Sequence, residues 1–187
     1  MNVYDFDETI FTGDTEDRFF EFMFKKKGFR HYKINWHFYN ILWKLHIITK
    51  TRSREGQYTF LKDIKDLDAT VQEYWDEIEK YMKPWYNDVK RPDDVIVSAS
   101  PDFLIDEIGR RLGVRVIATK MDIHTGKILG ENCADEEKVR RFKEEFPDCK
   151  IAEFYSDALR DAPMAEFAEK AYMVVDEGTR PIPWPDK

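Results

Sequence analysis

The stretch Asp5-Phe6-Asp7-Glu8-Thr9 places two aspartates directly after a short apolar run near the start of the chain. Residues 2–6 are predicted to form a buried strand with the acids at its C-terminal end. Taken alone, an Asp-x-Asp sequence after a strand is more often part of a turn than of a catalytic site. Its interpretation therefore depends on what the rest of the chain places beside it.

Beyond residue 92, predicted strands and helices alternate along the chain. Ser100 is expected to cap the first of these helices, with Pro101 at its first position. Residues 120–129 are expected to form a hairpin that turns at Thr125-Gly126, and residues 180–185 a proline-stiffened coil. The alternation predicts an α/β fold, a Rossmann-like parallel sheet flanked by helices. The predicted strands are 94–98, 114–118, 150–155 and 171–175, and the predicted helices are 100–112, 135–146 and 158–169.

A block of helices interrupts this pattern after the first strand. Its apolar residues recur at helical spacing, and Pro84 is expected to end the last helix. We predict an inserted α-helical cap at residues 14–86, and a catalytic core formed by residues 1–13 and 87–187. The predicted cap helices begin at residue 14 or 15 and run to 27, then cover 34–49, 54–67 and 68–82.

Composition narrows the class of protein. The chain has 187 residues, 42% of them hydrophobic, and a formal net charge of -7, which argues against nucleic acid as a partner. Two cysteines favour a reducing compartment over a secreted disulfide scaffold, so a cytoplasmic location is expected. The start of the chain is not patterned as a signal peptide, and no apolar run is long enough to predict a membrane span.

The charge is unevenly spread within the predicted cap. Residues 18–54 contain ten Lys or Arg against one acid, Glu21, together with ten aromatic residues. The simpler interpretation is that the aromatic side chains pack inward while the lysines extend into solvent. The alternative is a peripheral membrane contact, because basic and aromatic residues on one helical module are typical of membrane-surface helices.

Acidic and polar residues follow several of the predicted parallel strands. Ligands bind beyond the carboxyl ends of strands in such sheets, so these side chains are expected to converge. Four carboxylates at one edge would repel each other unless a cation lies among them, and hard oxygen ligands favour Mg²⁺. Lys138 would add positive charge at the same edge, which makes the site complementary to a phosphoryl group. The converging side chains are Asp5, Asp7, Ser98, Asp157 and Asp161.

The order of these motifs resembles the haloacid dehalogenase superfamily. Asp5-Phe-Asp7-Glu-Thr9 is similar to its Asp-x-Asp-x-Thr motif, and Ser98 and Lys138 stand where its second and third motifs are expected. Ser156-Asp157-Ala-Leu-Arg-Asp161 resembles the fourth motif, with serine where glycine is usual. The helical insertion after the first motif resembles the phosphoserine-phosphatase-like branch.

The resemblance implies a role for each matched residue. Asp5 would be the nucleophile that forms an aspartyl-phosphate, and Asp7 the acid and base. Ser98 and Lys138 would bind the phosphoryl group as further catalytic residues. Asp5, Asp157 and the main-chain carbonyl of Asp7 would ligate Mg²⁺, with Asp161 as a ligand or a support. We also expect Thr9, Asp14 and Ala99 to line the substrate site, although Asp14 is first interpreted as a helix cap.

These residues predict a Mg²⁺-dependent phosphatase acting on a small or amphiphilic organic phosphate, including a lipid phosphate. Asp7 favours phosphatase over dehalogenase chemistry, because a halide needs no proton on leaving. A phosphotransferase with the same intermediate, and a non-catalytic phospho-ligand or membrane-surface binding protein, remain alternatives. Arg52 and Arg54 are interpreted as part of a solvated loop, with substrate contact as the alternative. The sequence does not reveal the substrate or the oligomeric state.

Overall fold

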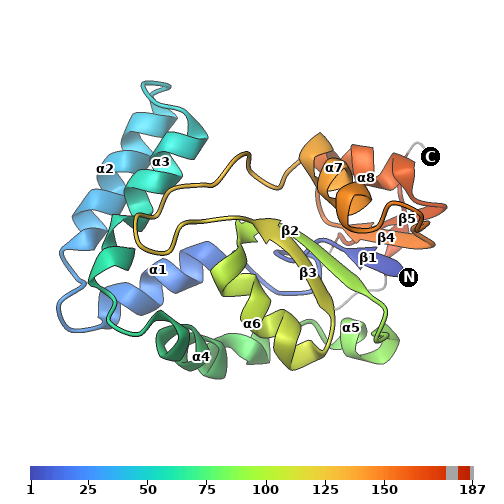
Figure 1. Cartoon of the computed structure of the whole chain (residues 1–187), viewed down its shortest axis with the longest axis horizontal. Coiled ribbons are helices and arrows are strands. Elements are labelled where there is room, and N and C mark those ends of the chain that lie inside the picture. The colour runs from blue at the N-terminus through green and yellow to red at the C-terminus, as the bar shows by residue number, and fades with distance from the viewer. Residues whose placement is uncertain (176–180, 186–187) are drawn as a thin grey trace.

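The strands of the computed structural model form one sheet in the order β3-β2-β1-β4-β5-β6 (Figure 1). The structure describes residues 1–175 and 181–185. β1 to β5 pair in parallel, and β6 pairs antiparallel with β5 at the edge. The predicted α/β fold is therefore confirmed. The strands are β1 (Asn2–Tyr4), β2 (Val95–Pro101), β3 (Arg115–Thr119), β4 (Glu153–Ser156), β5 (Lys170–Met173) and β6 (Ile182–Pro183).

Helices cover both faces of this sheet, which explains why its central strands are apolar on both sides. In β1, Val3 packs into a cluster with Phe142 of α7, whereas Tyr4 belongs to a second cluster with Leu104 of α6. Successive side chains of a strand point to opposite faces, so this alternation assigns α6 to one face and α7 and α8 to the other. These elements are α6 (Asp102–Leu112), α7 (Glu136–Glu145), η3 (Leu159–Asp161) and α8 (Ala162–Phe167).

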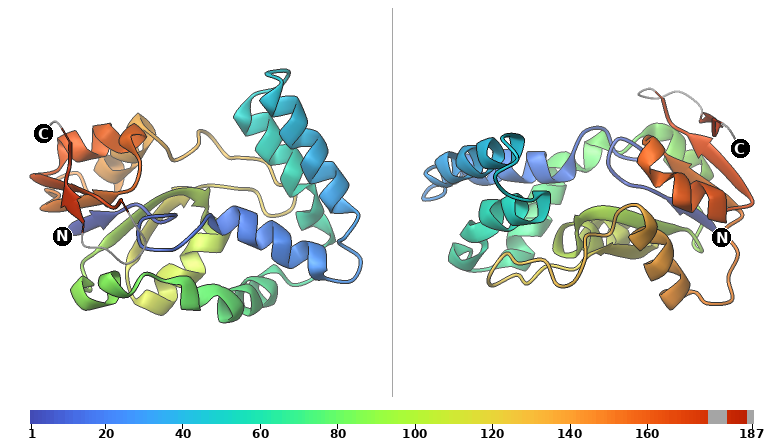
Figure 2. Two further views of the ribbon diagram at one scale, coloured as in Figure 1. Left: turned by 180° about the vertical axis from the view of Figure 1, so that it is seen from behind. Right: turned by 90° about the horizontal axis from the view of Figure 1, so that it is seen from above.

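The helices between β1 and β2 fall into an inner and an outer group (Figures 1 and 2). α1 and α4 share the core of the α6 face, where the Trp75 indole N–H donates to the Leu104 carbonyl at 2.7 Å. α2 and α3 pack against each other and project beyond the sheet. The helices are α1 (Thr15–Lys25), α2 (Tyr32–Lys44), α3 (Lys50–Gln57), η1 (Tyr58–Asp63), α4 (Leu67–Ile78), η2 (Glu79–Tyr81) and α5 (Pro84–Val89).

Several local predictions are confirmed. Asp14 caps α1, because its carboxylate accepts from the Asp17 backbone N–H at 2.9 Å. Gly113 ends α6 in the left-handed conformation at φ 71°, where glycine carries no Cβ penalty. Residues 120–129 form the expected hairpin, closed by the Met121–Ile128 bridge and turning at Gly126, which also has φ 71°.

Other helix boundaries were predicted wrongly. The helix expected at 54–67 begins instead at Lys50, because the Thr49 hydroxyl accepts from the Arg52 backbone N–H at 3.1 Å and caps it. Pro84 starts α5 instead of ending the preceding helix, as its missing N–H is no loss at a first helical position.

Two further predictions fail at strand ends. Ser100 does not cap a helix: β2 continues through Pro101, α6 starts at Asp102, and the Ser100 hydroxyl bonds to Asp7 instead. The predicted C-terminal coil contains β6, in which Ile182 pairs with Met173. The part of that prediction at residue 180 lies outside the described residues. Within the part of the chain that is described, no helix combines the length and apolar character needed to cross a membrane.

Candidate active site

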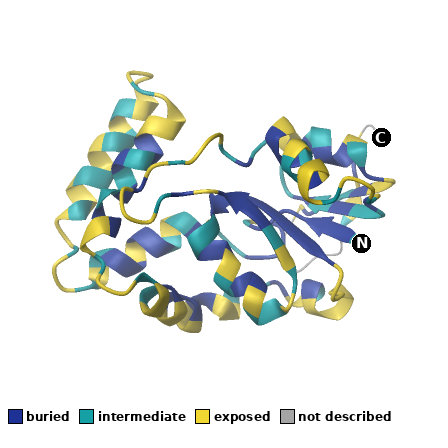
Figure 3. Ribbon diagram, viewed as in Figure 1, coloured by how far each residue is buried: buried dark blue, intermediate teal, exposed yellow. Residues whose placement is uncertain are grey.

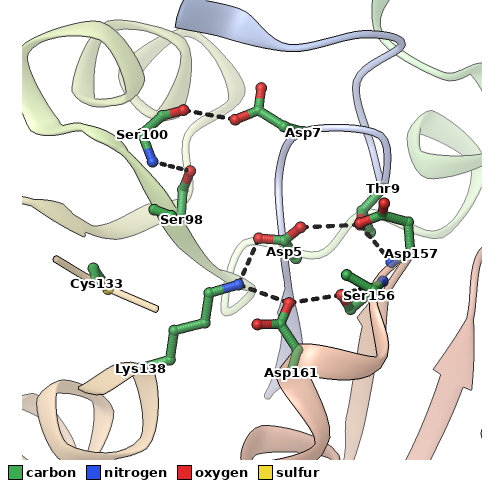
Figure 4. A network of polar contacts seen from close by, with 12 residues as sticks. Asp5, Asp7, Thr9, Ser98, Ser100, Cys133, Lys138, Ser156, Asp157 and Asp161 are labelled. Atoms are coloured by element: carbon green, nitrogen blue, oxygen red, sulfur yellow. Dashed lines mark hydrogen bonds and ion pairs between the residues drawn. The ribbon is translucent and has the colours of Figure 1, made fainter. Parts of the chain in front are cut away.

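The carboxyl ends of β1, β2 and β4 meet at one edge of the sheet, and the predicted site residues follow them (Figure 4). The Asp5 backbone N–H donates to the Tyr155 carbonyl at 2.9 Å, which extends the β1–β4 pairing and fixes Asp5 at this edge. Directly afterwards the chain turns, as the N–H groups of Thr9 and Ile10 donate to the Phe6 carbonyl at 3.2 and 3.0 Å. This turn brings the Thr9 side chain back beside Asp5.

Lys138 lies between two buried carboxylates. Its Nζ is 2.7 Å from Asp5 Oδ1 and 2.8 Å from Asp161 Oδ2. Lys138 stands one helical turn before the buried Phe142, so packing of α7 on the sheet aims both at the same face. Burial alone would lower the pKa of Lys138, but Asp5 and Asp161 raise it well above its usual range. The ammonium group therefore stays charged.

The Asp5 carboxylate is held from both sides. Burial raises its pKa to about 6, although the neighbouring Lys138 cation acts in the opposite direction. The Thr9 hydroxyl lies 3.3 Å from Asp5 Oδ2 and 3.2 Å from Asp157 Oδ1, and it accepts from the Asp157 backbone N–H at 3.0 Å. A hydroxyl has one hydrogen to donate, so it serves one of these two carboxylates at a time. Because the Asp5 and Asp157 carboxylates both lie beside the Thr9 hydroxyl, their negative charges would stabilise a cation bound between them.

Asp7 occupies a separate part of the site. Its Oδ1 accepts from the backbone N–H of Thr15 at 2.8 Å and from the Thr15 hydroxyl, and its Oδ2 accepts from the Ser100 hydroxyl at 2.6 Å. Burial, followed by the negative charge of Asp14, raises the pKa of Asp7 to about 8. Burial and Asp14 therefore favour the protonated form of Asp7, while the hydrogen bonds from Thr15 and Ser100 act in the opposite direction and fix the orientation of the carboxyl group.

The C-terminal part of β2 is irregular and polar, because its pairing with β3 shifts register between Ser98 and Pro101. The buried Ser98 hydroxyl accepts from the Ser100 backbone N–H at 3.1 Å. The Ala99 carbonyl accepts from Arg54 Nη2 and from the Thr119 hydroxyl, both at 2.7 Å. The part of β2 that carries Ser98 is thus anchored to β3 by Thr119 and to the inserted helices by Arg54.

Ser156 takes a defined role in place of the glycine expected from the motif. Its hydroxyl donates to Asp161 Oδ2 at 2.7 Å and accepts from the Ala158 backbone N–H at 3.2 Å. The serine therefore adds a hydrogen bond that orients the carboxylate beside Lys138, without crowding the loop. The other oxygen, Asp161 Oδ1, is buried and has no hydrogen-bond partner among the described residues.

The prediction that Arg54 belongs to a solvated loop is wrong. It is buried on α3, and its guanidinium donates to Glu16 Oε2 at 2.8 Å, to the Asn132 amide oxygen and to the Ala99 carbonyl. It thereby joins the inserted helices to the end of β2. Arg52 does remain exposed, with Glu55 3.6 Å away.

A cavity of about 670 Å³ is lined by Asp5, Asp7 and Arg54 among these groups. Its walls come partly from the sheet edge and partly from the inserted helices, including polar, basic and aromatic side chains. The volume exceeds what a phosphoryl group alone requires, so the cavity has room for an organic moiety. Among the lining residues are Asp5, Asp7, Asp14, Ala99, Ser100 and Asn132, facing Glu16, Trp36, Asn40, Ile41, Lys44 and Arg54.

The donor atoms at this edge fit a Mg²⁺ site that protein ligands complete only in part. In residues 1–175 and 181–185, no three His, Cys, Asp or Glu side chains converge to form a metal site by themselves. Asp5 and Asp157 both approach the Thr9 hydroxyl, and Asp161 Oδ1 is a buried oxygen without a partner. Mg²⁺ commonly takes one or two carboxylates, several waters and a substrate phosphate oxygen, which suits this donor set.

The structure thus brings most of the predicted site residues together in one network, and the remaining ones line the same cavity or the adjoining loop. Ser100, Glu16 and Asn132 were missed, and Arg54 was discounted. The partners of Arg54 are 38 residues away at Glu16 and 78 residues away at Asn132, so local sequence carries no signal for them. The network comprises Asp5, Thr9, Lys138, Ser156, Asp157 and Asp161, while Asp7, Asp14, Ser98 and Ala99 lie in the adjoining positions.

Comparisons with known proteins agree with this geometry. The sequence model of the haloacid dehalogenase-like hydrolase family matches residues 3–166. The protein CicA of Caulobacter vibrioides is 39% identical over 88 residues, a match that covers 43% of this chain and only 40% of CicA.

Solved structures show the same fold at low sequence identity. A Bordetella pertussis Tohama I protein of unknown function aligns with a TM-score of 0.79 at 20% identity, covering 92% of this chain and 88% of its own. A phosphoserine phosphatase, solved as a phospho-aspartyl intermediate analogue, aligns with a TM-score of 0.56 at 17% identity, covering 91% and 84%.

Proposed function

This chain belongs to the haloacid dehalogenase-like hydrolase family, and from that premise we propose that it hydrolyses a phosphomonoester through a phosphoryl group carried on Asp5. The observation that carries the proposal is the position of the Asp5 carboxylate. It lies at the end of β1, lines the cavity, and is held by Lys138 at 2.7 Å and by Thr9 at 3.3 Å. A buried carboxylate oriented by a fixed cation is suited to nucleophilic attack on phosphorus.

In the first step, a carboxylate oxygen of Asp5 forms a bond to phosphorus and the ester P–O bond breaks. The leaving alcohol oxygen takes its proton from the Asp7 carboxyl group. Support for this assignment comes from the hydrogen bonds of Thr15 and Ser100, which hold Asp7 in one orientation at the cavity wall. The alcohol can then leave, and Asp7 is an ionised base.

In the second step, a water oxygen attacks the phosphorus of the aspartyl-phosphate. Asp7 accepts a proton from that water, the Asp5–phosphorus bond breaks, and phosphate is released. Both residues return to their starting protonation states, so the cycle balances. Lys138 keeps one Asp5 oxygen paired throughout, and Ser98 is proposed to donate a hydrogen bond to a phosphoryl oxygen.

Asp5, Asp157 and the main-chain carbonyl of Asp7 are proposed to hold Mg²⁺, which would neutralise charge on the phosphoryl group when bound. Asp161 is then better placed as a support than as a main ligand, because its Oδ2 already accepts from Lys138 and Ser156. The orphaned Asp161 Oδ1 is free for a water of the metal shell.

Residues 14–86 are proposed to act as the cap that selects the substrate. The cavity contains cap residues Trp36, Asn40 and Arg54 opposite the carboxylates of the core, so the organic part of the ester would lie among them. A small or amphiphilic organic phosphate fits this composition. Cys133 and Cys149 are free thiols, which suits the reducing cytoplasm as the compartment.

A panel of amino-acid, sugar, nucleotide and lipid phosphates tests the function. We expect phosphate release from at least one member with Mg²⁺, loss of activity to background in excess EDTA, and recovery when Mg²⁺ is restored. An Asp157→Asn variant should require a higher Mg²⁺ concentration for half-maximal activity. An exposed control, Asp88→Asn, should match the parent chain.

Full activity in EDTA would contradict the metal assignment. Absence of turnover across the whole panel would contradict the hydrolase and favour a binding protein. Formation of a new phosphate ester in the presence of added alcohols, at the expense of free phosphate, would instead identify a phosphotransferase.

A further inference from the structure

α2 carries several exposed apolar residues, and Figure 3 shows the helix coloured as intermediate and exposed along its length. Ile34, Phe38, Ile41 and Leu45 follow each other at helical spacing and are 76%, 55%, 56% and 63% exposed. Ile47, in the turn after the helix, is 64% exposed. Ile34 to Leu45 span about 17 Å at 1.5 Å per residue. These four residues and Ile47 are here called the α2 stripe. Contiguous exposed apolar residues of this kind mark interaction surfaces.

The α2 stripe is not the side through which α2 packs. The inner side contacts α3, where the Asn35 amide donates to the Gly56 carbonyl at 2.8 Å and the Ser53 hydroxyl donates to the Tyr39 carbonyl at 2.9 Å. α2 has no buried residue along its length. α2 is therefore held against α3 by residues outside the stripe. Packing within the fold does not explain why the stripe residues are apolar.

The aromatic residues of the basic segment behave differently. Phe19, Phe20 and Phe22 are buried in the core of the α6 face, as the simpler sequence interpretation expects. Within residues 18–54, the exposed large apolar residues are mainly aliphatic and all lie on α2 or in the turn that follows it. Packing thus accounts for the aromatics of α1, and the stripe requires a separate explanation.

Six exposed lysines and arginines lie close to α2 in the sequence of a chain whose net charge is -7. Two belong to α2, two to the segment before it, one is the last residue of α1 and one is the first residue of α3. None of the six forms an ion pair with any acid in residues 1–175 or 181–185, so their charge is available to a partner. They are Lys25, Lys27, Arg30, Lys33, Lys44 and Lys50.

We propose that the α2 stripe and these cations form a docking surface for an anionic lipid bilayer. A helix that combines an apolar side with lysines and arginines lies in the plane of the membrane interface, with the apolar side among the acyl chains. Basic residues near the membrane surface are attracted to anionic lipids. A bilayer satisfies both features at once, whereas a neutral apolar partner would leave the cations unmatched.

Docking in this orientation places the catalytic cavity beside the headgroups. Ile41 belongs to the stripe and also lines the cavity, together with its neighbours Trp43 and Lys44. The docking itself does not depend on the proposed hydrolysis, so the two can fail separately.

Vesicle co-sedimentation tests the docking surface on the full chain. We expect binding to phosphatidylcholine vesicles that contain phosphatidylglycerol at low salt, weaker binding at high salt, and little binding to phosphatidylcholine alone. Phe38→Ser/Leu45→Ser should weaken binding by about tenfold or more, since it removes two apolar contacts. Lys33→Glu should weaken binding only to the anionic vesicles.

The matched control is Val89→Ser/Ile182→Ser. It removes two exposed apolar side chains that lie away from α2, on α5 and β6, and it should leave vesicle binding unchanged. Phe38→Ser/Leu45→Ser should also retain the circular dichroism melting curve of the parent chain, which shows that the fold is intact. No binding to anionic vesicles at low salt would overturn the proposal. So would a dimer of the parent chain that Phe38→Ser/Leu45→Ser converts to monomer, because the stripe would then bind a second copy.

Discussion

Replacing Asp5 with Asn is expected to reduce phosphate release by about 10⁴-fold or more, to the level of the uncatalysed background. The amide has nearly the same shape as the carboxylate and can still accept a hydrogen bond from Lys138 or Thr9. Its oxygen is a poor nucleophile, so no aspartyl-phosphate forms. The change should therefore remove the chemistry and keep the fold, as measured by steady-state phosphate release and by the circular dichroism melting curve.

The control for Asp5→Asn is Asp88→Asn, the same substitution at an exposed position on α5. It should leave both activity and melting unchanged. Activity of Asp5→Asn within tenfold of the parent chain would refute the nucleophile assignment. A melting curve that shows Asp5→Asn unfolded would attribute the loss of activity to the fold instead.

Replacing Lys138 with Met is expected to affect both stability and activity. Lys138 is buried between Asp5 and Asp161, so its removal leaves two close carboxylates without their shared cation. Breaking a buried ion pair in this way costs about 3–5 kcal/mol of unfolding free energy. Activity should fall by about 10³-fold, because the charge that stabilises the transferring phosphoryl group is lost. Urea unfolding and turnover measure the two effects.

A double variant separates stability from catalysis. Lys138→Met/Asp161→Asn removes one of the opposed carboxylates and should recover much of the lost unfolding free energy, while activity stays low. Lys143→Met, an exposed lysine on the same helix, should change neither quantity appreciably. Recovery of activity together with stability in the double variant would show that Lys138 only supports the fold.

The sequence predicted the parts of the site that follow from strand ends. Asp5 and Asp157 come directly after β1 and β4, and these strands are neighbours because parallel α/β connections leave few alternatives. Lys138 followed from the motif order, and the structure places its Nζ at Asp5. The residues that converge at this edge of the sheet belong to short local segments, which explains why their proximity could be predicted from the sequence.

Other contacts of the site join residues that are far apart in the sequence, so no local sequence pattern predicts them. Ser100-Pro101 carries the composition of a helix start, yet Ser100 bonds to Asp7, which is 93 residues away. Arg54 resembled a solvated side chain because its partners lie far away in the sequence, at Glu16 on α1, Ala99 in β2 and Asn132. Charge patterning identified the basic cap segment, but only packing separated the buried phenylalanines of α1 from the exposed stripe of α2.

The central claim is that the phosphoryl group is carried on Asp5, and trapping it tests this most directly. Asp7→Asn should accumulate the intermediate during turnover of p-nitrophenyl phosphate, because that leaving group needs no proton while the attacking water lacks its base. The reaction is quenched in acid and the protein is mapped by peptide mass spectrometry. We predict the added mass of one phosphoryl group on Asp5, absent from Asp5→Asn/Asp7→Asn. A phosphoryl group on another residue, such as Ser98 or Ser100, would contradict the account.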